Sequence, residues 1–285
     1  MNGFNLSDIQ DARLGGTQLS AIYLGSSKLW PTAIDYSKQY LTIESLEDNN
    51  AIGWKSNNST TKTIEWSTDK STWTSVTSST SGESLTSLNT GDKLYLRGNN
   101  NAYGATWSTW SYFTSTKTFN VYGNIKSLVY GDNFDNNNFP SNSTNFWRMF
   151  INTHVVDASN LILPSQVRST MYVLMFGSCT SLIAAPNLPN GSAYQSFNAM
   201  FNNCTSLTTG PVIYANPGQQ SYANLFDGCT SLNSVTVYAT SLGTNGFENW
   251  MNNVAPTGTF TKKAEMTLFP EGKNGIPSGW TIIDV

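Results

Sequence analysis

A short motif recurs three times in this chain at a constant spacing of 25 residues. The copies read MFGSCTSL from Met175, MFNNCTSL from Met200 and LFDGCTSL from Leu225. Spacing this regular is typical of chains whose structural units stack, because each unit alone is too small to bury its apolar face. The repeat therefore predicts a stack of similar turns.

Equivalent positions of the motif define a ladder of side chains. The ladder residues are Phe176, Cys179 and Leu182, then Phe201, Cys204 and Leu207, then Phe226, Cys229 and Leu232. The same register reaches Phe247 and Met251 downstream and, with one inserted residue, Phe146 and Phe150 upstream. We therefore expect about five turns, whose period lies within the range of leucine-rich repeats.

Each turn is predicted to combine a short helix with an extended stretch. Tyr172, Met175, Phe176 and Cys179 lie at i, i+3, i+4 and i+7, which is one face of a helix. An extended stretch interrupted by prolines follows. Residues 123–285 are expected to form this short solenoid, with a C-terminal cap from about residue 243.

Residues 32–122 read as short alternating strands separated by turn residues. The expected strands are KQYLTIESL, AIGWKS, TKTIEWST, STWTSVTS, DKLYLRG and WSYFTSTKTFNVYG. Their spacing predicts a β-sandwich of the immunoglobulin or fibronectin type, without a cysteine pair. The whole chain is thus predicted to be mainly β with short helices.

Residues 1–31 end in a predicted hairpin, Ala21–Leu24 and Lys28–Trp30, which is too small to be stable alone. Leaving Ile22, Leu24, Leu29 and Trp30 in water would cost about 1.5–3 kcal/mol for each large side chain. We expect this segment to dock on another protein or on its own copies. The alternative is that it folds back on the sandwich.

Two resemblances follow from these motifs. The segment IYLGSSKLWP resembles a short module near the start of many phage tail and fibre proteins. The MFxxCTSL units, GNIKSLVYGDNF and the cap NWMNNVAPTGTFTKKAEM resemble leucine-rich-repeat proteins of the bacterial surface-protein-A type, from gut bacteria and their phages. This chain departs from that family by having few turns and by carrying Thr153 where a cysteine is expected.

The composition excludes several classes of protein. A net charge of −3 argues against a protein that neutralises nucleic-acid phosphates. No apolar run approaches the length of a membrane span, so we expect no membrane insertion. The low charged fraction, 12%, is typical of proteins that work outside a cell, and equally of β-rich proteins whose strands are rich in serine and threonine. The N-terminus lacks the pattern of a secretory signal.

We expect no enzyme, metal or cofactor site. The chain has three cysteines and one histidine, His154, which lies one residue away from the ladder position. We interpret the cysteines as buried rungs of the stack. The loop from Asp132 to Phe139 hints at calcium but lacks the glycine and terminal glutamate of a calcium loop, so a solvated loop is the preferred interpretation.

Aromatic residues are the better functional candidates. Tyr103, Trp107, Trp110 and Tyr112 fall within about ten residues, separated by Gly, Ser and Thr. Exposed rings beside hydroxyls and amides suit the faces of sugars, so we predict a glycan contact here. The alternative is that one or two of these rings fill the sandwich core.

Together these observations predict a non-enzymatic virion protein of a bacteriophage. We expect a fibre-like or decoration subunit on the capsid or tail, made in the host cytoplasm, which forms homo-oligomers and attaches to host surface glycans. One alternative is a leucine-rich-repeat adhesin on a bacterial cell surface. A polysaccharide depolymerase is a further alternative, although its paired carboxylates are not evident in the sequence.

Overall fold

The computed structural model describes residues 34–106, 108–135, 144–272 and 274–285, together with the backbone of four short strands before residue 34. The chain is mainly β and divides into two compact units, residues 1–36 and 37–285. Within the described residues, no helix is long and apolar enough to cross a membrane.

The first unit contains two antiparallel strand pairs. Strand β1 (Arg13–Leu14) pairs with β2 (Thr17–Gln18), and β3 (Ile22–Leu24) pairs with β4 (Ser27–Trp30). The second pair confirms the predicted hairpin, with Tyr23 opposite Lys28. The proposed docking role of Ile22, Leu24, Leu29 and Trp30 concerns side chains that lie outside the described part of the structure.

A short 3-10 helix, η2 (Tyr36–Lys38), leads into the second unit, whose first part contains two sheets. The first sheet has the order β14-β13-β5-β10-β7-β8, with β15 also paired to β13. Its strands are β5 (Leu41–Ser45), β7 (Thr63–Ser67), β8 (Thr74–Thr77), β10 (Lys93–Gly98), β13 (Phe119–Asn124), β14 (Val155–Asp157) and β15 (Leu161–Ile162). The second sheet has the order β11-β12-β6-β9, made of β6 (Asn50–Ser56), β9 (Glu83–Leu88), β11 (Gly104–Thr106) and β12 (Thr109–Ser115).

All six predicted strands are present, but the prediction was incomplete. The longest predicted run, WSYFTSTKTFNVYG, is two strands, β12 and β13, separated by the exposed residues Thr116 and Lys117. Strands β9 and β11 were not predicted. In β9 only Leu85 and Leu88 are buried, so serine and threonine dominate its pattern and conceal the alternation.

The buried faces of both sheets contribute to one hydrophobic core. Trp54 of β6 lies at its centre, with ring centroids 5.8 Å from Tyr103 and 4.7 Å from Phe113. Gly98, which ends β10, is followed by the loop that leads to Tyr103. Helix α1 (Ser127–Tyr130) and the 3-10 helix η3 (Gly131–Asn133) then follow β13.

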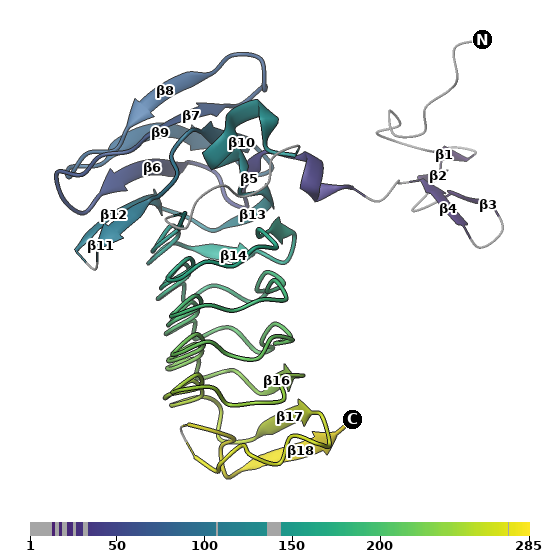
Figure 1. Ribbon diagram of the computed structural model, residues 1–285. Coiled ribbons are helices and arrows are strands. Elements are labelled where there is room, and N and C mark those ends of the chain that lie inside the picture. Colours follow the sequence, from purple (N-terminus) through teal and green to yellow (C-terminus); the bar gives the residue numbers. More distant parts are fainter. Residues whose placement is uncertain are drawn as a thin grey trace. The chain divides into compact units, whose positions relative to one another are not determined.

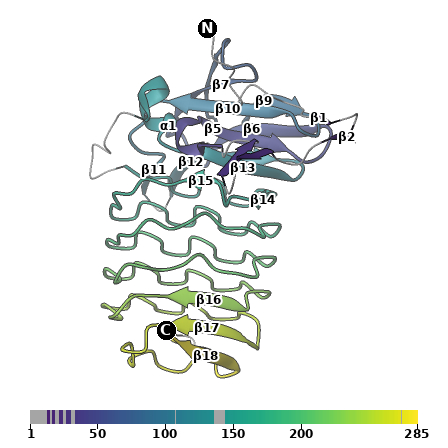
Figure 2. The same ribbon diagram turned by 90° about the vertical axis from the view of Figure 1, so that its right-hand side faces the viewer.

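The 25-residue units lie side by side below the two sheets (Figures 1 and 2). Each unit contains a chain of overlapping turns, which we call a turn chain; these are residues 146–153, 170–179, 195–204, 220–229 and 245–253. Within a turn chain, one set of N–H groups bonds three residues back, as Met175 does to the Tyr172 carbonyl at 3.1 Å. The alternate set bonds to the next turn chain, as Phe176 does to the Met200 carbonyl at 2.9 Å.

The short helix predicted in each unit is therefore wrong. Every fourth residue of a turn chain has a positive φ, for example Thr170 at 57°, Leu174 at 53° and Ser178 at 59°. A residue with a positive φ bonds through its own N–H to the neighbouring unit, as Leu174 does to the Asn198 carbonyl at 3.0 Å, whereas the next N–H, that of Met175, bonds within the turn chain. Because the turn chain and the helix both place residues i and i+4 on one face, the sequence periodicity does not distinguish them.

Two columns of stacked aromatic rings run through the units. The first contains Tyr103, Phe146, Tyr172, Phe197, Tyr222 and Phe247, with centroids 5.4–6.2 Å apart. The second contains Phe113, Phe150, Phe176, Phe201, Phe226 and Trp250, with centroids 5.4–6.1 Å apart. The upstream register at Phe146 and Phe150 is thus confirmed, whereas Trp250 rather than the buried Met251 ends the second column.

Both columns begin before the repeats, one at Tyr103 in the loop before β11 and the other at Phe113 in β12. The backbone N–H of Tyr103 bonds to the Asn145 carbonyl at 3.1 Å, and that of Phe113 bonds to the Met149 carbonyl at 2.9 Å. The predicted boundary at residues 122 and 123 falls inside strand β13, which pairs with β5 as well as with β14 and β15. Residues 37–285 are accordingly one compact unit.

The other end of the stack is closed by parallel strands and aromatic rings. Strands β16 (Ser234–Val237), β17 (Gly258–Lys262) and β18 (Trp280–Asp284) form a parallel sheet in that order. Phe260 and Phe269 pack around Trp250, with centroids 6.0 Å from it in both cases. This closing region corresponds to the predicted cap.

Candidate functional site

The burial and hydrogen bonds of the ladder cysteines indicate a structural role. Cys179, Cys204 and Cys229 are free and fully buried, as predicted. Each thiol donates to the carbonyl of a phenylalanine in the preceding turn chain; the Cys204 Sγ lies 3.1 Å from the Phe176 oxygen. Burial raises the pKa of Cys179 and Cys229 to about 12, and that of Cys204 well above its usual value.

A thiol with a raised pKa is neutral at physiological pH and is therefore a poor nucleophile or metal ligand. Among the described residues, no group of three or more His, Cys, Asp or Glu side chains is placed to hold a metal ion. His154 is exposed and contacts Ser115 rather than a cysteine. Thr153, which replaces the cysteine in the first turn chain, donates its hydroxyl to the Phe150 carbonyl at 2.7 Å.

Tyr103 is buried and is not the exposed glycan contact that the sequence predicted, so it is separate from the other aromatic residues of the predicted cluster. Its side chain is 1% exposed, begins the first aromatic column and donates its hydroxyl to the Leu128 carbonyl at 2.7 Å. Burial raises the pKa of Tyr103. The ring is part of the core because the loop after β10 turns it inward onto Trp54.

Trp110 and Tyr112 lie on the outer face of strand β12, because the alternating residues Ser111 and Phe113 are buried. The Arg148 guanidinium covers the Trp110 ring at 3.9 Å from its centroid. Both aromatic side chains are half-buried. Trp107 lies outside the described residues. Of the three predicted contacts that the structure describes, two therefore lie on the outer face of β12.

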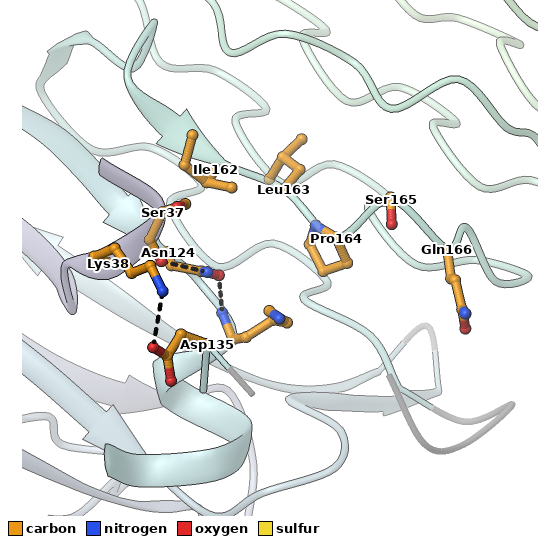
Figure 3. Close-up of a pocket in the computed structure, with 10 residues that line it drawn as sticks. Ser37, Lys38, Asn124, Asp135, Ile162, Leu163, Pro164, Ser165 and Gln166 are labelled. Carbon is orange, nitrogen blue, oxygen red and sulfur yellow. Dashed lines mark hydrogen bonds and ion pairs between the residues drawn. The ribbon is translucent and has the colours of Figure 1, made fainter. Parts of the chain in front are cut away.

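A pocket of about 290 Å³ lies beside η2 and strand β15 (Figure 3). Its polar wall contains an ion pair between Lys38 and Asp135 at 3.3 Å, and Asn124, which donates to the Ser37 carbonyl at 2.9 Å. Pro164 and Leu163 form the opposite wall (Figure 3). No aromatic ring lines this pocket among the described residues, so it offers little for stacking.

A second pocket, of about 380 Å³, lies on the outer face of the first sheet. Strand register places Arg97 of β10 opposite Glu65 of β7, and Glu65 opposite Ser75 of β8. These three side chains share the outer face because their neighbours Leu96 and Ile64 are buried. The Arg97 Nε donates to Glu65 at 2.7 Å, and the Ser75 hydroxyl lies 3.4 Å from the other oxygen of Glu65.

Segments outside the strands complete this site. Asp132 of η3 accepts from the Arg97 Nη1 at 2.6 Å and from the Tyr40 hydroxyl at 2.7 Å. The Trp73 ring lies 4.0 Å from the Arg97 guanidinium and 5.0 Å from the Tyr40 ring. We call Tyr40, Glu65, Trp73, Arg97 and Asp132 the Arg97 cluster.

The contacts within the Arg97 cluster shift the pKa of two of its members. The hydrogen bond from Tyr40 and the ion pair with Arg97 lower the pKa of Asp132. Burial of the ring, followed by its bond to Asp132, raises the pKa of Tyr40. Asp132 is thus anionic at neutral pH and able to accept hydrogen bonds, and it is not suited to act as a general acid.

The Arg97 cluster was missed at the sequence level because its five members come from five separate stretches. The alternation in KLYLRG and TIEWS does place Arg97 and Glu65 on outer faces. What the alternation does not give is the strand order, which brings β10 between β5 and β7. The predicted solvated loop was correct for the exposure of Asp132 but not for its ion pair.

Comparisons with protein-family models, curated proteins and solved structures find no match to this chain.

Proposed function

We propose that this chain is a non-enzymatic virion protein of a bacteriophage, a fibre-like or decoration subunit that contacts host surface glycans. The observation that carries the proposal is the pair of aromatic columns, which continue from Tyr103 and Phe113 without interruption to the closing rings. A stack that shares its core with two sheets makes a stiff support, which suits a protein that presents a binding surface. We propose that the two sheets are an immunoglobulin- or fibronectin-like sandwich and that the units are a short leucine-rich-repeat solenoid.

Glycan contact is supported by aromatic side chains on the outer faces of both sheets. Trp110 and Tyr112 project from β12, and Trp73 and Tyr40 belong to the Arg97 cluster. Rings beside carboxylates, amides and hydroxyls match the alternation of apolar and polar faces on a sugar. These groups lie on strands and short loops, which hold them in fixed positions.

The Arg97 cluster also bears on the depolymerase alternative. Glu65 and Asp132 are the two carboxylates closest to a shared pocket, but both are bonded to one guanidinium. A glycosidase needs one of its two carboxyl groups protonated, and the lowered pKa of Asp132 opposes this. We therefore propose binding without cleavage.

The test of glycan contact uses the purified full chain on an array of bacterial surface polysaccharides. Retention of at least one polysaccharide, without release of reducing ends, is the expected result. Steady release of reducing ends that one Asp or Glu substitution abolishes would place the protein among the enzymes. A chain that retains no polysaccharide would remove the attachment role.

The virion assignment has a separate test. We propose that residues 1–31 attach the chain to other virion proteins and that several copies associate. Mass spectrometry of purified particles should detect the full chain and should not detect a variant that lacks residues 1–31. Assembly of the truncated chain at normal copy number would overturn the anchor, and flanking genes for cell-surface export would favour the bacterial adhesin.

A further inference from the structure

We infer that the pocket of the Arg97 cluster binds the hydroxyl groups of an uncharged saccharide and discriminates against acidic sugars. This inference rests on the proposed function, because it names the class of glycan and the residues that select it. The pocket is lined by Glu65, Arg97 and Asp132 together with Thr63, Ile64, Ser75, Gly98, Asn99, Tyr130 and Gly131. Neither the glycan contact nor the docking segment predicted from the sequence includes these residues.

Charge is the first selective property of the pocket. Its lining holds two carboxylates, Glu65 and Asp132, and one cation, Arg97. The single guanidinium is engaged by both acids, at 2.7 Å and 2.6 Å, so its charge is already compensated. A sugar carboxylate entering the pocket would meet a net negative wall and would be repelled.

Hydrogen-bonding capacity is the second property. The hydrogen bond from Tyr40 and the ion pair with Arg97 lower the pKa of Asp132, whose side chain is 59% exposed. A carboxylate has four lone-pair sites, of which Arg97 and Tyr40 occupy only some on Asp132. The remaining sites accept hydroxyl protons, which a neutral sugar supplies in adjacent pairs. The exposed side chain of Asn99 adds an amide at the rim.

Rigidity is the third property. The Arg97 guanidinium is held on both sides, by two acids and by the Trp73 ring at 4.0 Å. The Trp73 Nε1 in turn donates to the Lys70 carbonyl at 3.2 Å. The acceptors are therefore fixed before a ligand arrives, which lowers the ordering cost of binding. Trp73 acts here as a positioning residue, because it packs against Arg97 and does not itself line the pocket.

The test compares an oligosaccharide with the same oligosaccharide oxidised at C6 to uronic acids. Dissociation constants are measured by calorimetry for the full chain, starting from the neutral glycan that it retains best on the array. We expect the neutral form to bind at least tenfold more tightly. Asp132→Asn keeps the side-chain volume but removes one negative charge. It should raise the dissociation constant of the neutral oligosaccharide several-fold and reduce the ratio between the dissociation constants of the oxidised and neutral forms.

Two further variants separate this site from the rest of the surface. Ser75→Ala, at an exposed lining position, should weaken neutral binding without changing the thermal midpoint. Glu271→Gln removes the same charge at the exposed closing region and should change neither affinity nor preference. Equal or tighter binding of the oxidised form, or unchanged binding in both Asp132→Asn and Ser75→Ala, would overturn the inference.

The outcomes also distinguish this inference from the proposed function. If Trp110→Ala abolishes glycan binding while Asp132→Asn leaves it unchanged, the chain is a glycan-binding protein but the Arg97 pocket is not its site. If neither neutral nor oxidised glycans bind the unaltered chain, the glycan role falls together with this inference.

Discussion

The thiol of Cys204 donates a hydrogen bond to the carbonyl oxygen of Phe176, 3.1 Å away in the preceding turn chain. The same oxygen already accepts the backbone N–H of Cys179 at 3.0 Å. The Cys229 thiol repeats this arrangement with Phe201 at 3.0 Å, and the Cys179 thiol repeats it with Phe150 at 2.9 Å. Thr153, at the cysteine position of the first turn chain, donates instead to Phe150 within its own turn chain. The repeated cysteine is therefore a donor that crosses between neighbouring units, as well as an apolar rung.

This bond predicts which residues can replace Cys204. Cys204→Thr keeps a side-chain donor at this position, whereas Cys204→Val has the same shape without a donor. We expect the valine variant to be less stable than the threonine variant by about 1 kcal/mol, since a buried acceptor loses one partner. Urea unfolding of both variants measures the difference. Equal stabilities would show that the thiol contributes only packing.

Buried thiols and phenols also predict a loss of stability in alkali. The pKa of Cys179 and Cys229 is raised to about 12, and burial raises the pKa of Cys204, Tyr103 and Tyr172 in the same direction. A raised pKa stabilises the fold fully below the unfolded-state value, about 8.5 for a thiol. That contribution is lost as pH rises toward the folded-state value.

Chemical denaturation between pH 8 and pH 11 measures this loss. The free energy of unfolding should fall steadily above about pH 9. A variant with all three cysteines replaced by threonine should lose less stability over the same range, because only the tyrosines then contribute. A flat profile for the unaltered chain would contradict the burial of these groups.

The residues with a positive φ predict that an Ala→Gly substitution at such a position stabilises the protein. Ala199 has a φ of 54°, and the equivalent residue one unit later is Asn224 at 55°. Ala199→Gly removes a left-handed strain of about 1–2 kcal/mol and adds a smaller chain-entropy cost. We expect a net stabilisation of about 0.5–1 kcal/mol. Ala223→Gly, at a buried position without a positive φ, is the control and should destabilise the protein. Thermal unfolding compares the two.

Two glycines with a similar positive φ allow the cost of backbone strain to be separated from the cost of a steric clash. Gly123 has a φ of 86° and Gly91 a φ of 83°. A Cβ on Gly123 would meet the Tyr40 carbonyl, whereas a Cβ on Gly91 meets nothing within 4 Å. Gly91→Ala should cost about 1 kcal/mol. Gly123→Ala should cost several times more, because strand β13 and Tyr40 must separate. Similar costs in urea unfolding would contradict this close approach.

The shared aromatic columns predict that the sheets and the repeats unfold together. Tyr103→Ala should destabilise the protein by about 3–5 kcal/mol, as expected for loss of a large buried ring. Hydrogen exchange should accelerate equally at Leu96 in β10 and at Phe201 in a turn chain. Tyr112→Ala, on the outer face of β12, is the control with a smaller effect. Protection that is lost at Leu96 but kept at Phe201 would indicate two independent parts.

The sequence predicted the order of the regions and the identity of the ladder residues, because a fixed spacing requires equivalent positions to meet. It did not predict the turn chains, since Tyr172, Met175 and Phe176 have the spacing of a helix face. Only the positive φ values at Leu174 and Ser178 distinguish the two backbones, and those residues rarely adopt such a conformation.

The aromatic cluster was predicted in part for a similar reason. Tyr103 and Tyr112 look alike in the sequence, but one lies in a loop that turns inward and the other alternates with buried residues. The Arg97 cluster depends on pairing between strands more than 30 residues apart, as the Arg97–Glu65 ion pair shows. Such pairings follow from sheet order, which local patterns do not specify.

The turn chains have a consequence for how proteins of this design change in length. Each chain uses half of its N–H groups to bond the next one, and each thiol serves a carbonyl one unit away. A unit therefore accepts backbone hydrogen bonds from one neighbour and donates equivalent hydrogen bonds to the other. Duplication or loss of a whole 25-residue unit leaves every remaining unit with an equivalent partner, whereas a one-residue slip within a turn chain leaves donors without acceptors. The distance between the two sheets and the closing strands can thus be lengthened or shortened in whole units by recombination, while the surfaces at either end remain unchanged.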